Sequence, residues 1–218
     1  MGRSDPIIFS KYCQVIDSVI SLEKIKSMKA CFLGFSQPNN FTSALSPSTS
    51  VFYDLSLNNW NINSDSWNIE KESFDIVIAT RVAYFSKNPK DFFLKCHEIL
   101  KPGGFLFVDW GLGDHWRFKE YKVGWVKGEE HEYAYSEDNF LWSTVWDDSF
   151  SNHPELRKFS KWIEKFGYSD LKSSIKKEVP SVLSLSDILS EFSLSCDIVS
   201  LWEESPQLYI VLCGKKIS

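Results

Sequence analysis

The sequence predicts an α/β protein with a doubly wound, mostly parallel sheet of seven or six strands, helices on both faces and an antiparallel C-terminal strand. Residues 74–79 and 105–108 are short apolar runs, typical of strands that are buried on both faces of a parallel sheet. The residues between them are numerous enough for a crossover helix. The chain ends in two more apolar runs, 197–202 and 207–213, whose short polar connection makes them antiparallel neighbours.

The segment from residue 73 to residue 108 has the pattern of one complete strand–helix–strand unit. Asn88 is a favourable helix N-cap, and Pro89 suits the first helical turn. Apolar residues recur behind them at helical spacing, and Pro102-Gly103-Gly104 predicts the end of the helix. We expect the connection to be right-handed, as it is in nearly all parallel crossovers.

The N-terminal part predicts one helix and two strands. Residues 7–27 form an amphipathic pattern whose apolar stripe includes Tyr12. This helix is expected to pack on the sheet, although a lid or a dimer contact would use the same pattern. Strands are expected at 29–35 and 51–55, with a short helix at 41–45 between them.

The remaining segments are less regular. Residues 56–72 are rich in Asn and Ser and allow at most a short strand at 67–69, so the crossover should be abbreviated. An aromatic-rich insertion at about 111–150 should be structured, with β-hairpins as one arrangement. Helices are expected at 153–166 and, after a serine cap, at 186–192.

Composition favours one soluble domain over residues 1–218. A chain of 218 residues that is 43% hydrophobic can bury one good core. The net charge of −5 disfavours general binding to nucleic acid or to an anionic membrane. Five widely spaced cysteines without a CxxC pair indicate reduced thiols and a cytoplasmic location. No apolar run approaches membrane-spanning length, and no His/Cys cluster predicts a metal site.

The identities of the residues in the strand–helix–strand unit indicate a particular protein family, whereas their apolar pattern indicates only a fold class. SFDIVIA, at 73–79, and FFLKCHEILKPGGFLFVD, at 92–109, resemble strands four and five of class I S-adenosylmethionine-dependent methyltransferases. In that family a Phe–Asp pair opens strand four, and a Lys-Pro-Gly-Gly turn precedes strand five. The resemblance extends more weakly from about Lys29 to Asp109 and returns at the C-terminus. It implies S-adenosylmethionine as the cofactor.

Ligands of doubly wound sheets bind outside the carboxyl ends of the strands, so the segments that follow the expected strands are candidate sites. Asp54 lies 20 positions after Gly34, close to the spacing between a glycine turn and an acid that holds a ribose diol. A helix or turn cap is the other interpretation of Asp54. The resemblance implies an acidic contact to the adenine amino group near Asp65 or Ser66, where a solvated turn is the alternative.

Arg81 could face the methionine portion of the cofactor, hold a substrate acid or form a surface salt bridge. The complete set of cofactor-binding candidates is Gly34, Phe35, Ser36, Asp54, Leu55, Asp65, Ser66, Thr80 and Arg81.

The first loop departs from the family pattern, because Gly34 is its one glycine where the family usually has several. Phe35 and Gln37 could crowd a ligand there, whereas Ser36 is small enough to replace a glycine at negative φ. A methyltransferase-like fold with a decayed cofactor site, acting as a binding or scaffold protein, is therefore the alternative hypothesis.

The catalytic candidates follow the fifth strand of the resemblance, at Asp109, Asp114 and His115. Methyl transfer from a sulfonium mainly requires an in-line arrangement, together with a base where the acceptor carries a proton. His115 is preferred as that base because histidine titrates near neutrality. The leading hypothesis is transfer of a methyl group to a small or medium-sized acceptor, and the oligomeric state is left open.

Overall fold

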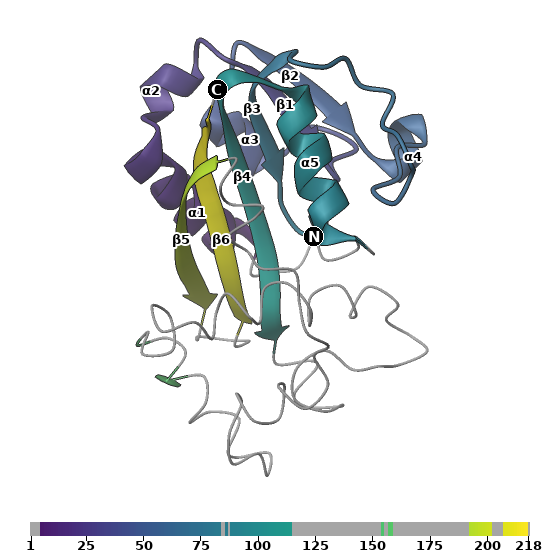
Figure 1. The fold of residues 1–218 in the computed structure, drawn as a ribbon. Coiled ribbons are helices and arrows are strands. Elements are labelled where there is room, and N and C mark those ends of the chain that lie inside the picture. The colour runs from purple at the N-terminus through teal and green to yellow at the C-terminus, as the bar shows by residue number, and fades with distance from the viewer. Residues whose placement is uncertain are drawn as a thin grey trace.

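The computed structural model describes residues 5–83, 86, 88–114, 154, 157–158, 192–201 and 207–217. Five helices and six strands are delimited within them (Figure 1). In chain order these elements are α1 Asp5–Val19, α2 Leu22–Ile25, β1 Lys29–Leu33, α3 Asn40–Leu45, β2 Thr49–Tyr53, α4 Leu55–Asn58, β3 Phe74–Ala79, α5 Pro89–Ile99, β4 Leu100–Asp114, β5 Phe192–Leu201 and β6 Gln207–Lys216.

The six described strands form one sheet in the order β2-β1-β3-β4-β6-β5. Neighbouring strands from β2 to β4 are parallel, whereas β6 runs antiparallel to both β4 and β5. The order reverses direction after β1, because β2 lies on one side of it and β3 on the other. The predicted doubly wound, mostly parallel sheet is confirmed, with its antiparallel strand inserted between β4 and β5.

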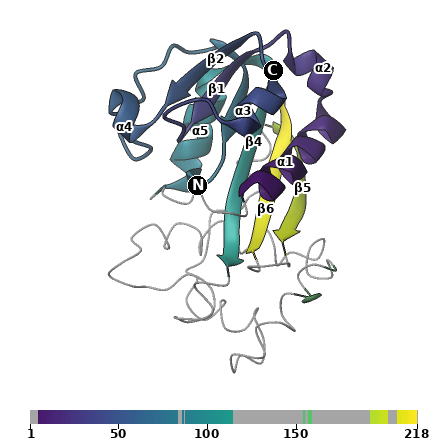
Figure 2. The same ribbon diagram turned by 180° about the vertical axis from the view of Figure 1, so that it is seen from behind.

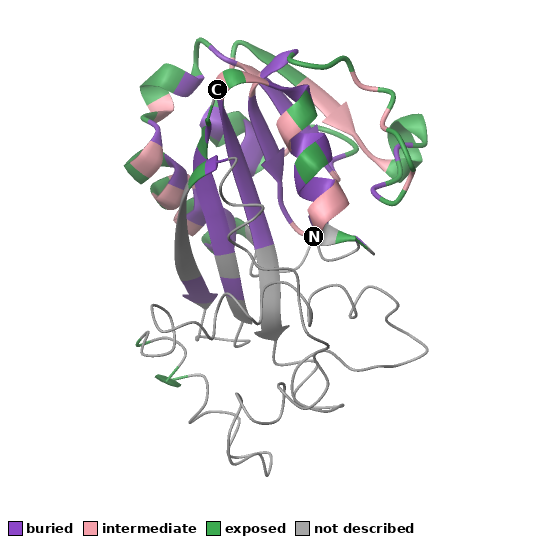
Figure 3. Cartoon of the chain, viewed as in Figure 1, coloured by how far each residue is buried: buried purple, intermediate pink, exposed green. Residues whose placement is uncertain are grey.

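Helices cover both faces of this sheet. Figures 1 and 2 show α5 on one face, and α1 and α3 on the other. The strands alternate accordingly: Phe105 and Phe107 of β4 join the core beneath α1, while Leu106 and Val108 are also buried and take the alternate positions. Buried residues therefore run along the central strands almost without interruption (Figure 3).

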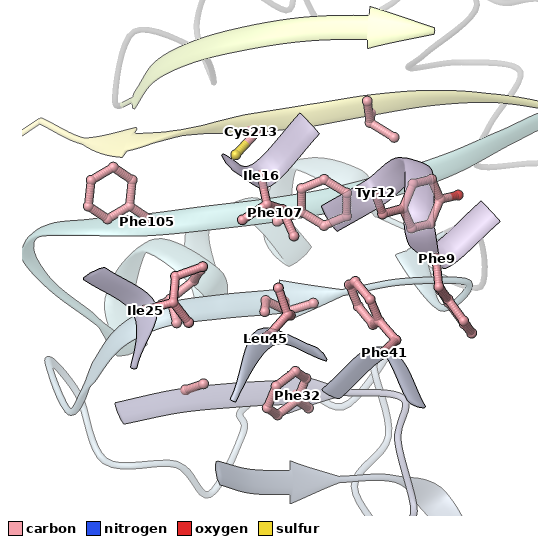
Figure 4. Close-up of a cluster of buried hydrophobic side chains, with 14 of the residues drawn as sticks. Phe9, Tyr12, Ile16, Ile25, Phe32, Phe41, Leu45, Phe105, Phe107 and Cys213 are labelled. Atoms are coloured by element: carbon pink, nitrogen blue, oxygen red, sulfur yellow. The ribbon is translucent and has the colours of Figure 1, made fainter. Parts of the chain in front are cut away.

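The core beneath α1 is aromatic. The Tyr12 ring lies 5.4 Å from that of Phe107, and the Phe9 ring stacks on Phe41 of α3 at 4.9 Å. Ile16 and Ile20 continue the buried stripe along the helix (Figure 4 shows the first of them). This packing is what places the polar end of Tyr12 near the carboxyl ends of the strands.

The single helix expected at 7–27 is wrong in its extent, because two helices occupy that stretch. Ser21 has an extended backbone with φ −53° and ψ 133°, which interrupts the helical hydrogen-bond pattern. The Asp17 carboxylate accepts a 2.8 Å hydrogen bond from the Leu22 backbone N–H across the break. The first N–H of α2 thereby has a hydrogen-bond partner, so the break between the helices costs little free energy.

The abbreviated crossover is confirmed. After β2 the chain makes only the four-residue helix α4, and residues 59–73 contain no strand, so the optional strand at 67–69 is absent. Thr49–Tyr53 consequently forms an edge of the sheet. On that edge the Asn58 side-chain amide donates to the Phe52 carbonyl and accepts from the Asp54 N–H, both at 3.1 Å. Asn58 thus satisfies backbone groups that a neighbouring strand would otherwise bind.

The strand expected at 105–108 is much longer than predicted. β4 begins directly after α5 at Leu100, passes through Pro102-Gly103-Gly104 and continues to Asp114. Its register against β3 shifts there, since Phe74 lies opposite Leu100 and Ile76 opposite Phe105. Residues 111–114 therefore belong to the sheet, and the remainder of the expected insertion, 115–150, lies outside the described residues.

The two C-terminal strands are confirmed, and both are longer than the expected 197–202 and 207–213: β5 begins earlier, at Phe192, and β6 ends later, at Lys216. Phe192, the last residue of the helix expected at 186–192, is the first residue of β5, while 186–191 lie outside the described residues. Of the helix expected at 153–166, only residues 154, 157 and 158 are described, and they are helical. No helix in the described part of the chain has the length and apolar character needed to cross a membrane.

Candidate functional site

The carboxyl ends of β1, β2 and β3 meet around Gly34. Gly34 has φ +78°, and its N–H donates a 2.7 Å hydrogen bond to the Tyr53 carbonyl at the end of β2. A Cβ at this position would lie 2.7 Å from the Cβ of Val82, which follows β3. Both the left-handed backbone and the close approach of Val82 therefore require a glycine at the predicted glycine turn.

The two residues after Gly34 face in different directions. Phe35 is 7% exposed, with its ring 5.6 Å from that of Phe32 and 6.4 Å from that of Phe41. It belongs to the core cluster beneath α1 and α3. Ser36 and Gln37 are exposed. The large apolar side chain of this loop is thus committed to the core, and a small hydroxyl faces solvent.

Asp54 lies at the end of β2 as predicted, and it caps α4. Its Oδ1 accepts hydrogen bonds from the Ser56 N–H at 2.9 Å and the Ser56 hydroxyl at 2.5 Å. Asn58 fixes the Asp54 backbone, as described above. Oδ2 accepts no hydrogen bond from any described residue, which leaves one oxygen of a half-buried carboxylate available. Leu55, the next residue, is 64% exposed.

Asp65 lines a polar cavity of about 370 Å³ between the irregular segment before β3 and the start of α5. The other lining residues are Asn63, Ser86, Asn88 and Asp91. Amide, hydroxyl and carboxylate groups of this kind suit a ligand with several hydrogen-bonding atoms. Ser66 is exposed and does not line this cavity.

Thr80 and Arg81 follow β3. Thr80 is buried, and its hydroxyl has no hydrogen-bond partner among the described residues. Arg81 has a left-handed backbone with φ +57°. Its guanidinium carbon lies 5.9 Å from the Phe9 ring centroid and 5.5 Å from that of Tyr209, to whose hydroxyl it donates a 3.2 Å hydrogen bond. Aromatic faces on both sides therefore hold this cation.

Asp109 is completely buried at the point where β4 passes the end of β3. Its Oδ2 accepts a 2.6 Å hydrogen bond from the Tyr12 hydroxyl, and its Oδ1 accepts a 2.6 Å hydrogen bond from the Arg81 N–H. Burial raises the pKa of Asp109 to about 6, although these hydrogen bonds act in the opposite direction. Burial, followed by the charge of Asp109, also raises the pKa of Tyr12 well above its ordinary value.

The other two catalytic candidates are less closely defined. Asp114 is the last residue of β4 and lies opposite Gln207, and its side chain lies outside the described parts. His115 lies outside the described residues. Among the described residues, no group of three His, Cys, Asp or Glu side chains could hold a metal ion.

The structure joins some of the predicted residues and leaves others separate. It links Asp109 to Arg81 directly, and Gly34 to the segment just after Arg81. Neither Asp54 nor Asp65 forms a hydrogen bond or an ion pair with these residues. Sequence reasoning missed Tyr12 and Tyr209 as members of this cluster. The signal available for Tyr12 was its hydroxyl, which lies in an otherwise aliphatic stripe of the first helix. A buried Tyr hydroxyl usually has a hydrogen-bond partner, so a polar group was to be expected nearby.

One comparison with known proteins matches part of the candidate site, including Asp65, Thr80 and Arg81, whereas Gly34, Asp54 and Asp109 lie outside the matched region. The family model of the methyltransferase domain matches residues 55–108, which extend from α4 through most of β4. No curated protein matches the chain.

Several solved structures are similar to the chain at low sequence identity. An S-adenosylmethionine-dependent methyltransferase from Thermotoga maritima has 12% identity and a TM-score of 0.42, with 96% of this chain and 98% of that chain covered. The 1,6-didemethyltoxoflavin N1-methyltransferase of Burkholderia thailandensis, with 1,6-didemethyltoxoflavin and S-adenosylhomocysteine bound, has 8% identity and a TM-score of 0.48, with coverages of 97% and 79%. The methyltransferase CalH in complex with S-adenosylhomocysteine has 13% identity and a TM-score of 0.46; the match covers 93% of this chain but only 54% of CalH.

Proposed function

We propose that this chain is a class I S-adenosylmethionine-dependent methyltransferase and that it methylates a small or medium-sized acceptor in the cytoplasm. The observation that carries the proposal is the methyltransferase-domain match at residues 55–108, which includes β3, α5 and most of β4. The cofactor is S-adenosylmethionine, whose sulfonium supplies an already activated methyl group. The protein's own task is therefore to bind, to orient and to handle a proton.

The proposed ribose contact is the Asp54 carboxylate. A carboxylate has two oxygens that can accept from the ribose hydroxyls, and Oδ2 is available while Oδ1 caps α4. Leu55, exposed beside it, offers an apolar surface. Asp65 and the polar cavity are proposed to receive the adenine, with the Asp65 carboxylate accepting from the amino group.

The proposed methionine end lies at the carboxyl ends of β1 and β3. Gly34 gives the turn its left-handed backbone and lets Val82 pack closely against it, and Ser36 is exposed in the same loop. Thr80 supports this proposal, because its buried hydroxyl has no partner in the described part of the structure. Arg81 supplies a positive charge between two aromatic rings, which suits a carboxylate group.

We propose His115 as the general base, with Asp114 as an alternative. Both oxygens of Asp109 already accept hydrogen bonds inside the core, so this carboxylate is better suited to organising the site than to reaching an acceptor. A cytoplasmic location is supported by Cys13, Cys31 and Cys96, which form no disulfide among the described residues. The net charge of −5 supports a small-molecule acceptor over nucleic acid.

Isothermal titration with S-adenosylmethionine and S-adenosylhomocysteine tests the proposal. Wild-type protein should bind both, and Asp54→Asn should weaken binding at least about tenfold, because the amide can still cap α4 through its oxygen but offers a donor to the ribose. Asp17→Asn is a matched control, since Asp17 also accepts a backbone hydrogen bond but lies at the break between α1 and α2. A folded wild-type protein that gives no heat with either compound contradicts the proposal.

A binding or scaffold protein with a decayed cofactor site is the second candidate function. The single glycine of the first loop and the use of Asp54 Oδ1 as a helix cap favour it. The same titration separates the two functions, because only the enzyme requires cofactor affinity. Methyl transfer from labelled S-adenosylmethionine to any acceptor would exclude the scaffold function.

A further inference from the structure

The wall of the polar cavity that carries Asp65 has no regular secondary structure. Residues 59–73 connect α4 to β3 without a helix or a strand, so backbone pairing of a third strand does not hold them. Aromatic contacts supply part of the support: the Trp67 ring lies 5.0 Å from that of Trp60 and 5.9 Å from that of Phe92 on α5. These contacts attach the segment to α5. Within the segment, Asn61 accepts hydrogen bonds from the Asn63 and Ser64 N–H groups and so shapes the polar turn at 63–65, but neither bond connects this turn to α5.

Lys95 supplies the polar attachment. This residue of α5 is 7% exposed, and its ammonium donates to the backbone carbonyl of Ser64 and, at 2.5 Å, to Asp91 Oδ2. The same nitrogen lies 5.8 Å from the Trp67 ring centroid. Burial of a lysine is unfavourable unless its charge is paired and hydrogen-bonded, and all three contacts provide that compensation. The ammonium is therefore held in place on several sides.

The two hydrogen-bond partners of Lys95 belong to opposite walls of the cavity. Asp91, from α5, lines one wall, and Ser64 immediately precedes Asp65 on the other. A single buried ammonium thus sets the separation of these walls. Because Asp65 is the next residue after the bound carbonyl, its backbone is held by the same contact.

We propose that Lys95 is a positioning residue that holds the turn at 63–65 so that the Asp65 carboxylate faces the cavity and selects an amino-substituted purine. This inference rests on the proposed function, in which that carboxylate accepts from the adenine amino group. Hypoxanthine carries a carbonyl oxygen at the corresponding place, and a carboxylate repels it. A site built around a hydrogen-bond partner discriminates strongly against a ligand that lacks the matching group.

The test compares two purines in matched variants of the full chain. Lys95→Met keeps most of the side-chain volume but removes the donors, while Lys95→Arg retains a cation with several donors. Lys90→Met is the control, because Lys90 lies on the same helix and forms no hydrogen bond or ion pair with any described residue. Binding of S-adenosylhomocysteine and S-inosylhomocysteine is measured by titration calorimetry.

Lys95→Met should weaken binding of S-adenosylhomocysteine by about tenfold and leave binding of the inosine compound nearly unchanged, so that the selectivity ratio falls. Lys95→Arg should restore part of the ratio, and Lys90→Met should retain all of it. An unchanged ratio in Lys95→Met overturns the role of Lys95 while the proposed function stands. Equal loss of both ligands also overturns it, because a purely structural effect would do that.

Hydrogen exchange provides a readout without any ligand. In Lys95→Met the amides of residues 61–66 should exchange faster than in Lys90→Met, with no change in β3 and β4. Equal exchange in the two variants overturns the positioning role. A folded wild-type protein that binds neither purine compound overturns the proposed function, and with it the adenine selectivity assigned to Lys95.

Discussion

The Tyr12 hydroxyl donates a 2.6 Å hydrogen bond to Asp109 Oδ2 inside the core, and this bond ties α1 to the middle of β4. Both side chains are completely buried. The second oxygen of the same carboxylate holds the backbone of Arg81. One buried acid therefore connects the N-terminal helix, the end of β3 and the central part of β4 at the edge of the candidate site.

Removal of the Tyr12 hydroxyl should lower stability. Tyr12→Phe keeps the ring packing but leaves one oxygen of a buried carboxylate without its donor, which costs about 1–3 kcal/mol of unfolding free energy. Urea denaturation monitored by circular dichroism measures the change. Tyr53→Phe is the control, because the Tyr53 hydroxyl forms no hydrogen bond with any described residue and Tyr53 is only half-buried. Equal stability of the two variants would show that the bond between α1 and β4 contributes nothing.

The raised pKa of Asp109 predicts a specific pH dependence. The folded pKa is about 6 against an ordinary value of 3.8, so between these values the folded state binds more protons than the unfolded state. The contribution to stability is therefore complete below about pH 4 and is lost as the pH rises through about 6. At about 1.4 kcal/mol for each pKa unit, the loss is on the order of 3 kcal/mol.

Asp109→Asn isolates this contribution, because asparagine remains neutral throughout. We subtract the unfolding free energy of the variant from that of wild type at each pH. This difference should decrease as the pH rises from 4 to 7, because the contributions of all other carboxylates are the same in both proteins and cancel. Urea denaturation at four pH values measures it. Parallel curves for the two proteins would contradict a raised Asp109 pKa.

The glycine turn after β1 should tolerate no side chain. Gly34→Ala would combine a positive φ of 78° with a contact of 2.7 Å to the Val82 Cβ, so we expect a loss of about 3 kcal/mol or more. Gly103→Ala is a matched comparison: its φ is +70°, but the nearest atom is the flexible Lys215 Cε at 3.2 Å. It should cost only about 1–2 kcal/mol. Thermal denaturation of both variants separates the backbone effect from the collision, and equal losses would exclude the collision with Val82.

Asn58 should affect ligand binding more than stability. Asn58→Ala removes the two hydrogen bonds to the edge of β2, but water can replace them at this exposed site, so the unfolding free energy should fall by less than about 1 kcal/mol. The backbone of Asp54 loses its restraint, and affinity for S-adenosylhomocysteine should fall several-fold. Ser18→Ala is the control, since the exposed Ser18 hydroxyl on α1 donates to the Val15 carbonyl and lies outside the proposed cofactor site. An unchanged affinity in Asn58→Ala would show that Asp54 needs no such support.

Local sequence signals were sufficient for the central unit of the fold. The Phe74–Ala79 strand has the predicted limits, and α5 begins at Pro89 with the Asn88 side chain accepting from the Asp91 N–H, as a helix cap should. Buried parallel strands require continuous apolar runs, and caps depend on neighbouring residues, so both are visible in a short window. The helix break at Ser21 was not visible in this way, because an apolar stripe continues past it.

For Asp109, the sequence predicted the position of the residue, whereas the tertiary structure decided its chemical environment. Its position after an apolar strand was enough to make it a site candidate, and the glycine turn at Gly34 was predictable from its place after β1. Whether Asp109 would be exposed or buried depended on the docking of α1, a helix that begins about a hundred residues earlier, and on the hydroxyl that Tyr12 brings with it. The sequence by itself thus determined which of the central strands form and the order in which they follow one another along the chain. The tertiary structure alone decided which polar groups meet, because hydrogen bonds over long sequence separations leave no periodic trace in the chain.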